Sequence, residues 1–195
     1  MKVQIFLRFA TTVLLGLLSF GSAAAQEPRT VTDHLMAVPN DLFKLVDENF
    51  EFADPAPKTK ADMDKYRRSK ILVEDIKNGY IEYEHNEFPT QIALFKKDAG
   101  GYLMAVSVRS LVHADNGQVC AGDLAFIEYN GGEWLNVSEK YAPKLNAIEA
   151  KKAKRLLSCY ELPREGRTLR LYSLFWDSED TWGHFEWNGT KFVGK

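Results

Sequence analysis

The chain has 195 residues, with 25 basic and 27 acidic side chains and a formal net charge of −2. This length suits one domain with a sizeable buried core. The slightly acidic balance gives no support for nucleic-acid binding, which needs a basic patch. The densest basic run, Lys151 to Arg155, is typical of the solvated face of a helix. We therefore expect no nucleic-acid partner.

Residues 1–25 have the pattern of a secretory signal peptide. Lys2 and Arg8 form a short basic region, and the apolar run Phe9–Phe20 follows. This run is too short for a membrane span, which takes roughly 20 apolar residues. We expect cleavage after Ala25 and a periplasmic or secreted mature chain, with an uncleaved anchor as the alternative.

The mature chain, residues 26–195, is expected to form a single mainly-β domain. Without Lys2 and Arg8 it keeps 23 basic and 27 acidic residues, a formal charge of −4. None of its apolar segments is long enough to cross a membrane. Its first part, residues 26–39, is polar and irregular, which predicts a flexible lead-in.

Two short helices are expected before the first strand. Asn40 suits the N-cap of a helix over residues 41–50, because its side chain can accept a hydrogen bond from the first turn. Thr59 and Asp62 have the spacing of a capping box. They predict a second helix that runs to Ser69.

From Ile71 the apolar residues recur with period two, and turn residues separate the runs. Asn78-Gly79 is the dipeptide that type I′ hairpins favour. The same scheme recurs further along, with turns expected at residues 98–101, 130–132, 177–180 and 188–190. A helical interval is expected over residues 145–157.

Several of these runs carry apolar residues at both odd and even positions, as residues 123–129 do. Such a sheet must be covered on both faces. We therefore predict an α+β fold that is mainly antiparallel β. In it, serial hairpins form a sandwich, a barrel or a strongly curved sheet with two or three short helices.

Two cysteines remain after cleavage, Cys120 and Cys159. In an exported chain an even pair most simply forms a disulfide. It would close a loop of about 40 residues and stabilise the fold by roughly 4 kcal/mol in the chain-entropy model. A reactive thiol is the alternative.

The sequence supplies no catalytic or metal-binding motif. It has no Gly-x-Ser-x-Gly and no Cys-x-x-Cys, and its four histidines share no close ligand spacing. The acidic pair Glu82 and Glu84 could serve a glycosidase, but it also fits a half-exposed strand. We expect no catalytic residue, no metal and no cofactor.

Three of the four tryptophans lie between Phe175 and Phe192. If this segment contains a strand, alternation places Phe185 and Trp187 on one face, toward the core. The opposite face then carries a candidate binding site formed by three residues, Trp182, His184 and Glu186. Gly183, in mid-strand, predicts a bulge or a close approach by another segment.

These patterns favour an exported, non-catalytic binding or interaction protein of the bacterial envelope. Its partner would be an envelope protein or a glycan, and an inhibitor of an envelope-attacking enzyme is one version. The alternatives are a small periplasmic hydrolase that acts on cell-wall or glycan material, and a purely structural envelope protein. The sequence leaves the oligomeric state open.

Overall fold

The computed structural model describes residues 28–85, 88–114, 117–146, 159–175 and 178–195. The helical elements in this part are α1 (Val31–Ala37), α2 (Asn40–Phe43), the 3-10 turn η1 (Phe50–Phe52), α3 (Lys60–Ser69) and α4 (Ser138–Tyr141). The first five strands are β1 (Ile71–Asp75), β2 (Tyr80–Tyr83), β3 (Thr90–Lys96), β4 (Tyr102–Ala114) and β5 (Gly117–Asn130). The others are β6 (Glu133–Asn136), β7 (Cys159–Glu161), β8 (Thr168–Phe175), β9 (Ser178–Trp187) and β10 (Phe192–Gly194). The predicted α+β, mainly antiparallel fold is confirmed.

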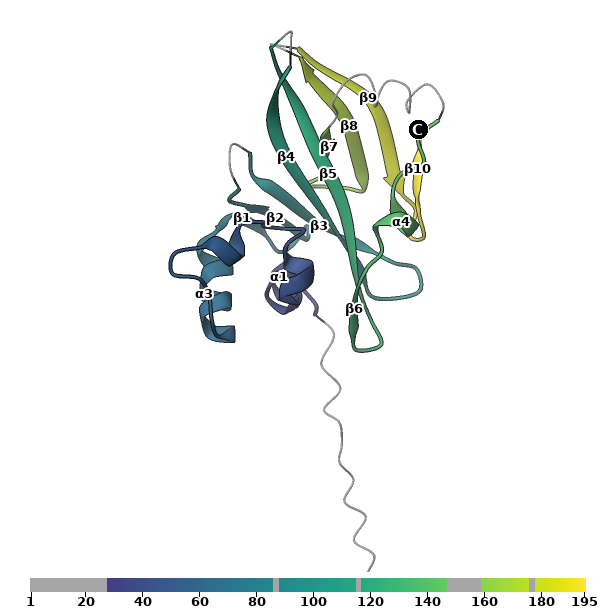
Figure 1. Cartoon of the computed structure of the whole chain (residues 1–195). Coiled ribbons are helices and arrows are strands. Elements are labelled where there is room, and N and C mark those ends of the chain that lie inside the picture. The colour runs from purple at the N-terminus through teal and green to yellow at the C-terminus, as the bar shows by residue number, and fades with distance from the viewer. Residues whose placement is uncertain (1–27, 86–87, 115–116, 147–158, 176–177) are drawn as a thin grey trace, which may run out of the picture.

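The strands form one hydrogen-bonded antiparallel network in the order β1-β2-β3-β4-β5-β8-β9-β10. Strand β6 pairs with β5 and β7 pairs with β8. Strands β5 and β8 connect the first part of this network, β1 to β6, with the second part, β7 to β10. The paired residues of β5 and β8 are Val119 and Phe175. Figure 1 shows the long β4–β5 ribbon at the centre, with β8, β9 and β10 beside it and the N-terminal helices under β1–β3.

Side chains of the central strands alternate between two separate cores. Ile92 of β3 and Met104 of β4 belong to a core that the N-terminal helices complete with residues such as Leu35. Their neighbours in the chain belong to a second core, which β8, β9, β10 and α4 complete. The central strands are therefore covered on both faces, as the two-sided apolar pattern predicts.

The helical layer differs from the prediction at its start. The expected flexible lead-in over 26–39 is wrong for α1, whose Val31 and Leu35 are fully buried. A capping box between Thr30 and Asp33 begins this helix. The buried apolar residues of this stretch, Val31, Leu35 and Val38, are too few to give a clear helical pattern in the sequence, so the helix depends on its contact with the sheet.

The two helices that the sequence predicts, α2 and α3, agree with the structure to different degrees. The helix predicted over 41–50 is shorter, since α2 ends at Phe43, and Pro39 rather than Asn40 occupies its N-cap. Helix α3 is confirmed, with the predicted capping box between Thr59 and Asp62. The longest of the described helices is too short and polar to cross a membrane.

Four of the predicted hairpins are confirmed, namely β1–β2, β3–β4, β5–β6 and β9–β10. The predicted acidic turn over 177–180 is wrong from Ser178 onward, because those residues pair with β8 as the start of β9. The predicted helical interval at 145–157 lies almost wholly outside the described residues.

The turn between β9 and β10 rests on the hairpin between β3 and β4. The Asp98 amide donates to the Gly189 carbonyl at 3.0 Å, and the Trp187 indole Nε1 donates to the Lys96 carbonyl at 2.7 Å. Gly189 has φ +97°, and a Cβ there would collide with the Asp98 carboxylate. A glycine is therefore needed for this contact, which holds the C-terminal strands over the central sheet.

Candidate functional site

The predicted binding face on β9 is only partly described. His184 is exposed and Glu186 is half-buried, with its Oε2 atom 2.8 Å from Lys195 Nζ. Both ends of this ion pair are about half exposed, so it contributes little energy. The side chain of Trp182 lies outside the described residues. The three-residue site Trp182, His184 and Glu186 therefore stays a prediction.

The backbone at Gly183 shows both features that its position predicts. Strand β9 has one extra residue, Trp182, opposite the point where the register shifts between Leu171 and Tyr172 of β8. A Cβ at Gly183 would lie 3.0 Å from the Leu171 Cβ and 2.9 Å from Phe185 Cε2. The bulge interrupts the strict alternation on which the predicted three-residue face depends.

Around the cysteines, the structure describes one of the two side chains. Cys159 is fully buried on β7, and the described part of the chain contains no free cysteine. A Cβ at Gly122 of β5 would lie 3.3 Å from the Cys159 sulfur. Cys120 is two residues earlier on the same strand, but its side chain lies outside the described residues. The Cys120–Cys159 disulfide therefore stays a prediction.

The disulfide predicts a specific result in thiol titration. We expect no reactive thiol in the mature protein after unfolding without reductant, and two after reduction. Reduction should lower the free energy of unfolding by roughly 4 kcal/mol. Two thiols in the unreduced, unfolded protein would show that Cys120 and Cys159 are not bonded.

The carboxylates considered for hydrolysis have structural partners. Glu84 lies 2.9 Å from the Lys70 ammonium, and Glu82 accepts a hydrogen bond from the Tyr80 hydroxyl at 3.0 Å. Among the described residues, no group of three His, Cys, Asp or Glu side chains is arranged to hold a metal ion. The acidic residues at the start of β9 have no described side chains.

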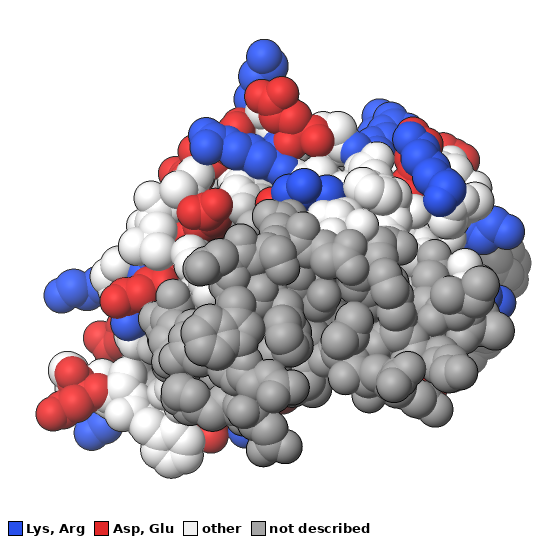
Figure 2. Space-filling view, turned by 90° about the horizontal axis from the view of Figure 1, so that it is seen from above, with Lys and Arg blue, Asp and Glu red and all other residues white. Residues whose placement is uncertain are grey.

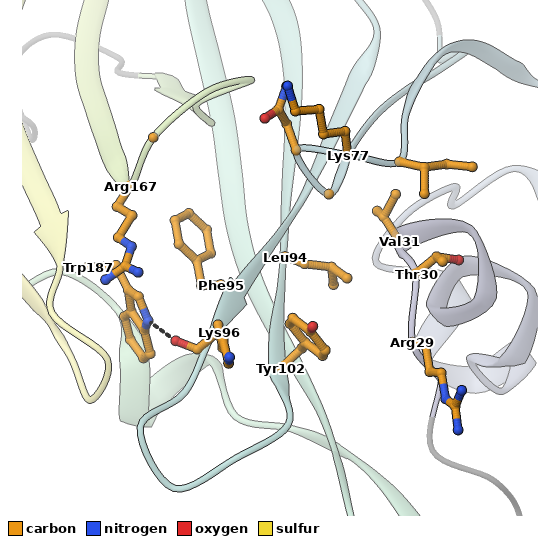
Figure 3. A pocket seen from close by; sticks show the side chains of 14 residues that line it. Arg29, Thr30, Val31, Lys77, Leu94, Phe95, Lys96, Tyr102, Arg167 and Trp187 are labelled. Carbon is orange, nitrogen blue, oxygen red and sulfur yellow. Dashed lines mark hydrogen bonds between the residues drawn. The ribbon is translucent and has the colours of Figure 1, made fainter.

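A pocket of about 200 Å³ opens between the helical layer, the central sheet and the segment before β8. Its walls come from the approach to α1, the β1–β2 turn, the β3–β4 hairpin and residues 166–167. Its cationic lining residues are Arg29, Lys77, Lys96 and Arg167. Figure 3 shows Arg167 beside Trp187 on one wall, Arg29 on the opposite wall, and Lys77 on a third side.

The charged side chains among the described lining residues are all positive. All four cations are exposed, no Asp or Glu lines the pocket, and none of the four has an ion-pair partner within the described ranges. On the face seen in Figure 2, by contrast, the described basic and acidic side chains are interspersed. The pocket is therefore a local region of positive charge on a chain with a net negative charge.

The floor of the pocket is apolar. It includes Leu94, the buried ring of Phe95, and Tyr102, whose ring packs edge-on against His34 with centroids 5.7 Å apart. A cationic rim over an apolar floor can bind an anionic group by charge-assisted hydrogen bonds and exclude water beneath it. Sequence reasoning missed this site because its cations come from four segments that only the tertiary fold brings together.

The comparisons with known proteins add no candidate function. No protein-family model matches the chain, and neither does any curated protein or solved structure. A function for this chain is therefore inferred from the chemistry of the cationic pocket and of the predicted face on β9.

Proposed function

We propose that the mature chain is an exported, non-catalytic binding protein of the bacterial envelope, and that the cationic pocket holds an anionic group of its protein or glycan partner. The observation that carries this proposal is the gathering of four exposed cations around one pocket, with no carboxylate among its described lining residues. Negative charge elsewhere on the mature chain repels an anionic partner, so encounters are directed to this region. Inhibition of an envelope-attacking enzyme is one form that such binding takes.

The number of cations matters for affinity. An exposed charge pair contributes about 0.2–1 kcal/mol, so a single surface lysine would not hold a partner. Four such contacts sum to at most ~4 kcal/mol, which corresponds to a dissociation constant near 1 mM. Tighter binding therefore needs the apolar floor as well, and the pocket offers both.

The hydrolase alternative finds no support in this pocket. General acid–base catalysis needs a histidine, a carboxylate or a comparable proton-transfer group beside the substrate. Within the part of the chain that the structure describes, the lining contains neither a histidine nor a carboxylate, the groups that serve most often in this role. A hydrolytic activity would have to use other residues, and it stays the second prediction from the sequence.

The proposal is tested by capture from envelope extract with three immobilised proteins. These are the mature wild type, the pocket variant Lys77→Ala/Arg167→Ala, and a control variant, Lys65→Ala/Arg68→Ala, that removes two exposed cations from α3 instead. We expect wild type and control to retain the same component. The pocket variant should bind it about 2- to 30-fold more weakly, since two lost charge contacts of ~0.2–1 kcal/mol each amount to ~0.4–2 kcal/mol.

All three proteins should melt at the same temperature, because the substituted side chains are exposed. Equal retention by the pocket variant would overturn the proposal. Release of soluble fragments from cell-wall material by the wild-type protein would favour the hydrolase instead.

A further inference from the structure

We infer that the partner is a protein and that the pocket receives an acidic segment of it, in which carboxylates flank an apolar side chain. This inference rests on the proposed binding function and deepens it, because it chooses between a protein and a glycan. Four properties of the pocket carry it: the separation of its cations, its shortage of hydrogen-bond acceptors, the burial of its tryptophan ring, and an exposed apolar side chain at its edge.

The cations stand on different walls. Figure 3 shows Arg29 and Arg167 on opposite sides, with Leu94, Phe95 and Tyr102 between them. A ligand that uses both sides needs negative charges at separate points and an apolar part between them. An extended peptide has this form, because its side chains follow each other at about 3.3 Å per residue.

The side chains of the lining offer many hydrogen-bond donors and few acceptors. Arginine and lysine side chains only donate. Acceptor atoms on lining side chains are confined to Thr30, Asn78 and Tyr102, and the Thr30 hydroxyl already accepts from the Asp33 amide at 3.0 Å. A carboxylate only accepts and fits this lining, whereas each sugar hydroxyl also has a proton to donate. An acidic glycan carries several such hydroxyls on each ring, whereas an extended peptide has one backbone N–H per residue, so the glycan would leave more donors without partners.

Two of the aromatic side chains in the lining, Phe95 and Trp187, are buried and offer no open platform for a sugar ring. Trp187 is 1% exposed, and its ring packs against Phe192, Tyr141 and Phe95 with centroid distances of 5.1, 5.7 and 6.0 Å. Its faces are therefore in contact with the core. Stacking on sugars requires an accessible ring face.

An apolar contact is available to a peptide instead. Ile76, in the β1–β2 turn, lines the pocket and is 54% exposed, which is high for a large aliphatic side chain. It lies in the same lining as Leu94 of β3. A leucine or valine between two carboxylates of the partner could bury this surface, and a sugar chain has no equivalent group.

The inference is tested with three small probes that bind the mature protein in solution. The first is the peptide Gly-Glu-Leu-Glu-Gly-Glu, the second is the same peptide with glutamine in place of glutamate, and the third is trigalacturonate. The first and third carry three side-group carboxylates each, so they differ in scaffold rather than in this charge. We expect the glutamate peptide to bind at least 10-fold more tightly than either of the others, and more weakly as salt concentration rises.

Two variants assign the binding to the pocket. Arg29→Ala/Arg167→Ala removes one cation from each wall and should weaken glutamate-peptide binding about 10-fold. Ile76→Ser should weaken it as well but leave any trigalacturonate binding unchanged. Lys65→Ala/Arg68→Ala, which removes the same charge from α3, should leave all probes unaffected.

The outcomes separate the two proposals. Trigalacturonate that binds as tightly as the glutamate peptide, or more tightly, overturns the choice of a protein partner while the pocket remains an anion site. Failure of the glutamate peptide to bind also overturns it. Failure of every probe, together with unchanged envelope capture by the pocket variant, overturns the binding function itself.

Discussion

Replacing Trp187 with alanine should lower the free energy of unfolding by ~3–5 kcal/mol, the usual cost of truncating a large buried aromatic side chain. The side chain is 1% exposed and touches rings from three other elements, those of Phe95, Tyr141 and Phe192. Its indole N–H donates to the Lys96 carbonyl. The substitution would thus open a cavity and also remove the contact that holds the end of β9 on β3.

Unfolding by guanidinium, followed by far-ultraviolet circular dichroism, measures this loss without depending on tryptophan fluorescence. Phe52→Ala is the control, because Phe52 is 82% exposed and its truncation should change stability by less than about 0.5 kcal/mol. A Trp187→Ala protein as stable as wild type would contradict the assignment of this residue to the core. Loss of partner binding at unchanged stability would instead make Trp187 a ligand platform.

Trp187 also shows what sequence alone can predict. Alternation along residues 181–187 placed Phe185 and Trp187 on the buried face, and the structure confirms it. The hairpin at Asn188-Gly189 was equally readable, because its turn requires a residue with positive φ. Both predictions succeed because period-two patterns and turn chemistry act over a few residues.

The failures share the opposite property, dependence on distant segments. Ser178 has turn-forming neighbours in the sequence, yet it lies in a strand because β8 offers it a partner at Phe175. Helix α1 has only a short apolar face, and the central sheet buries it. In the same way, Arg29 and Arg167 line one pocket only because the fold brings their distant segments together.

The second large effect is expected at Arg67, which is 2% exposed and lies on α3, in contact with α1. Its Nη1 atom donates to the carbonyls of Leu35 and Met36 at 2.8 and 3.0 Å. In a continuing helix the Leu35 carbonyl would accept from the residue four positions later, but that residue is Pro39, which has no N–H. The guanidinium thus supplies the donor that the proline lacks, at the end of α1.

Two opposing contributions to the free energy of unfolding decide the effect of Arg67→Met. Burial lowers the pKa of Arg67 to about 10, which shows that the charged form is costly in this environment, and methionine would remove that cost. It would also remove the donor from the Leu35 carbonyl, which is buried, and from the Met36 carbonyl, which is partly buried. Leaving a buried acceptor unpaired costs about 1–3 kcal/mol. The Arg67 contact with the Phe43 ring, 4.1 Å from guanidinium carbon to centroid, would be lost as well. We expect the losses to prevail, with a net destabilisation of ~2–4 kcal/mol.

The neighbouring substitution Arg68→Met is the matched control, because Arg68 is exposed on the same helix and should tolerate the change within about 0.5 kcal/mol. Stability should not vary with pH between 5 and 8 through Arg67, since both its folded pKa, about 10, and its unfolded value lie above this window. Denaturant unfolding at pH 7 distinguishes the two terms. An Arg67→Met protein at least as stable as wild type would mean that desolvation of the guanidinium outweighs its hydrogen bonds to α1, and α1 would then be held by its apolar face alone.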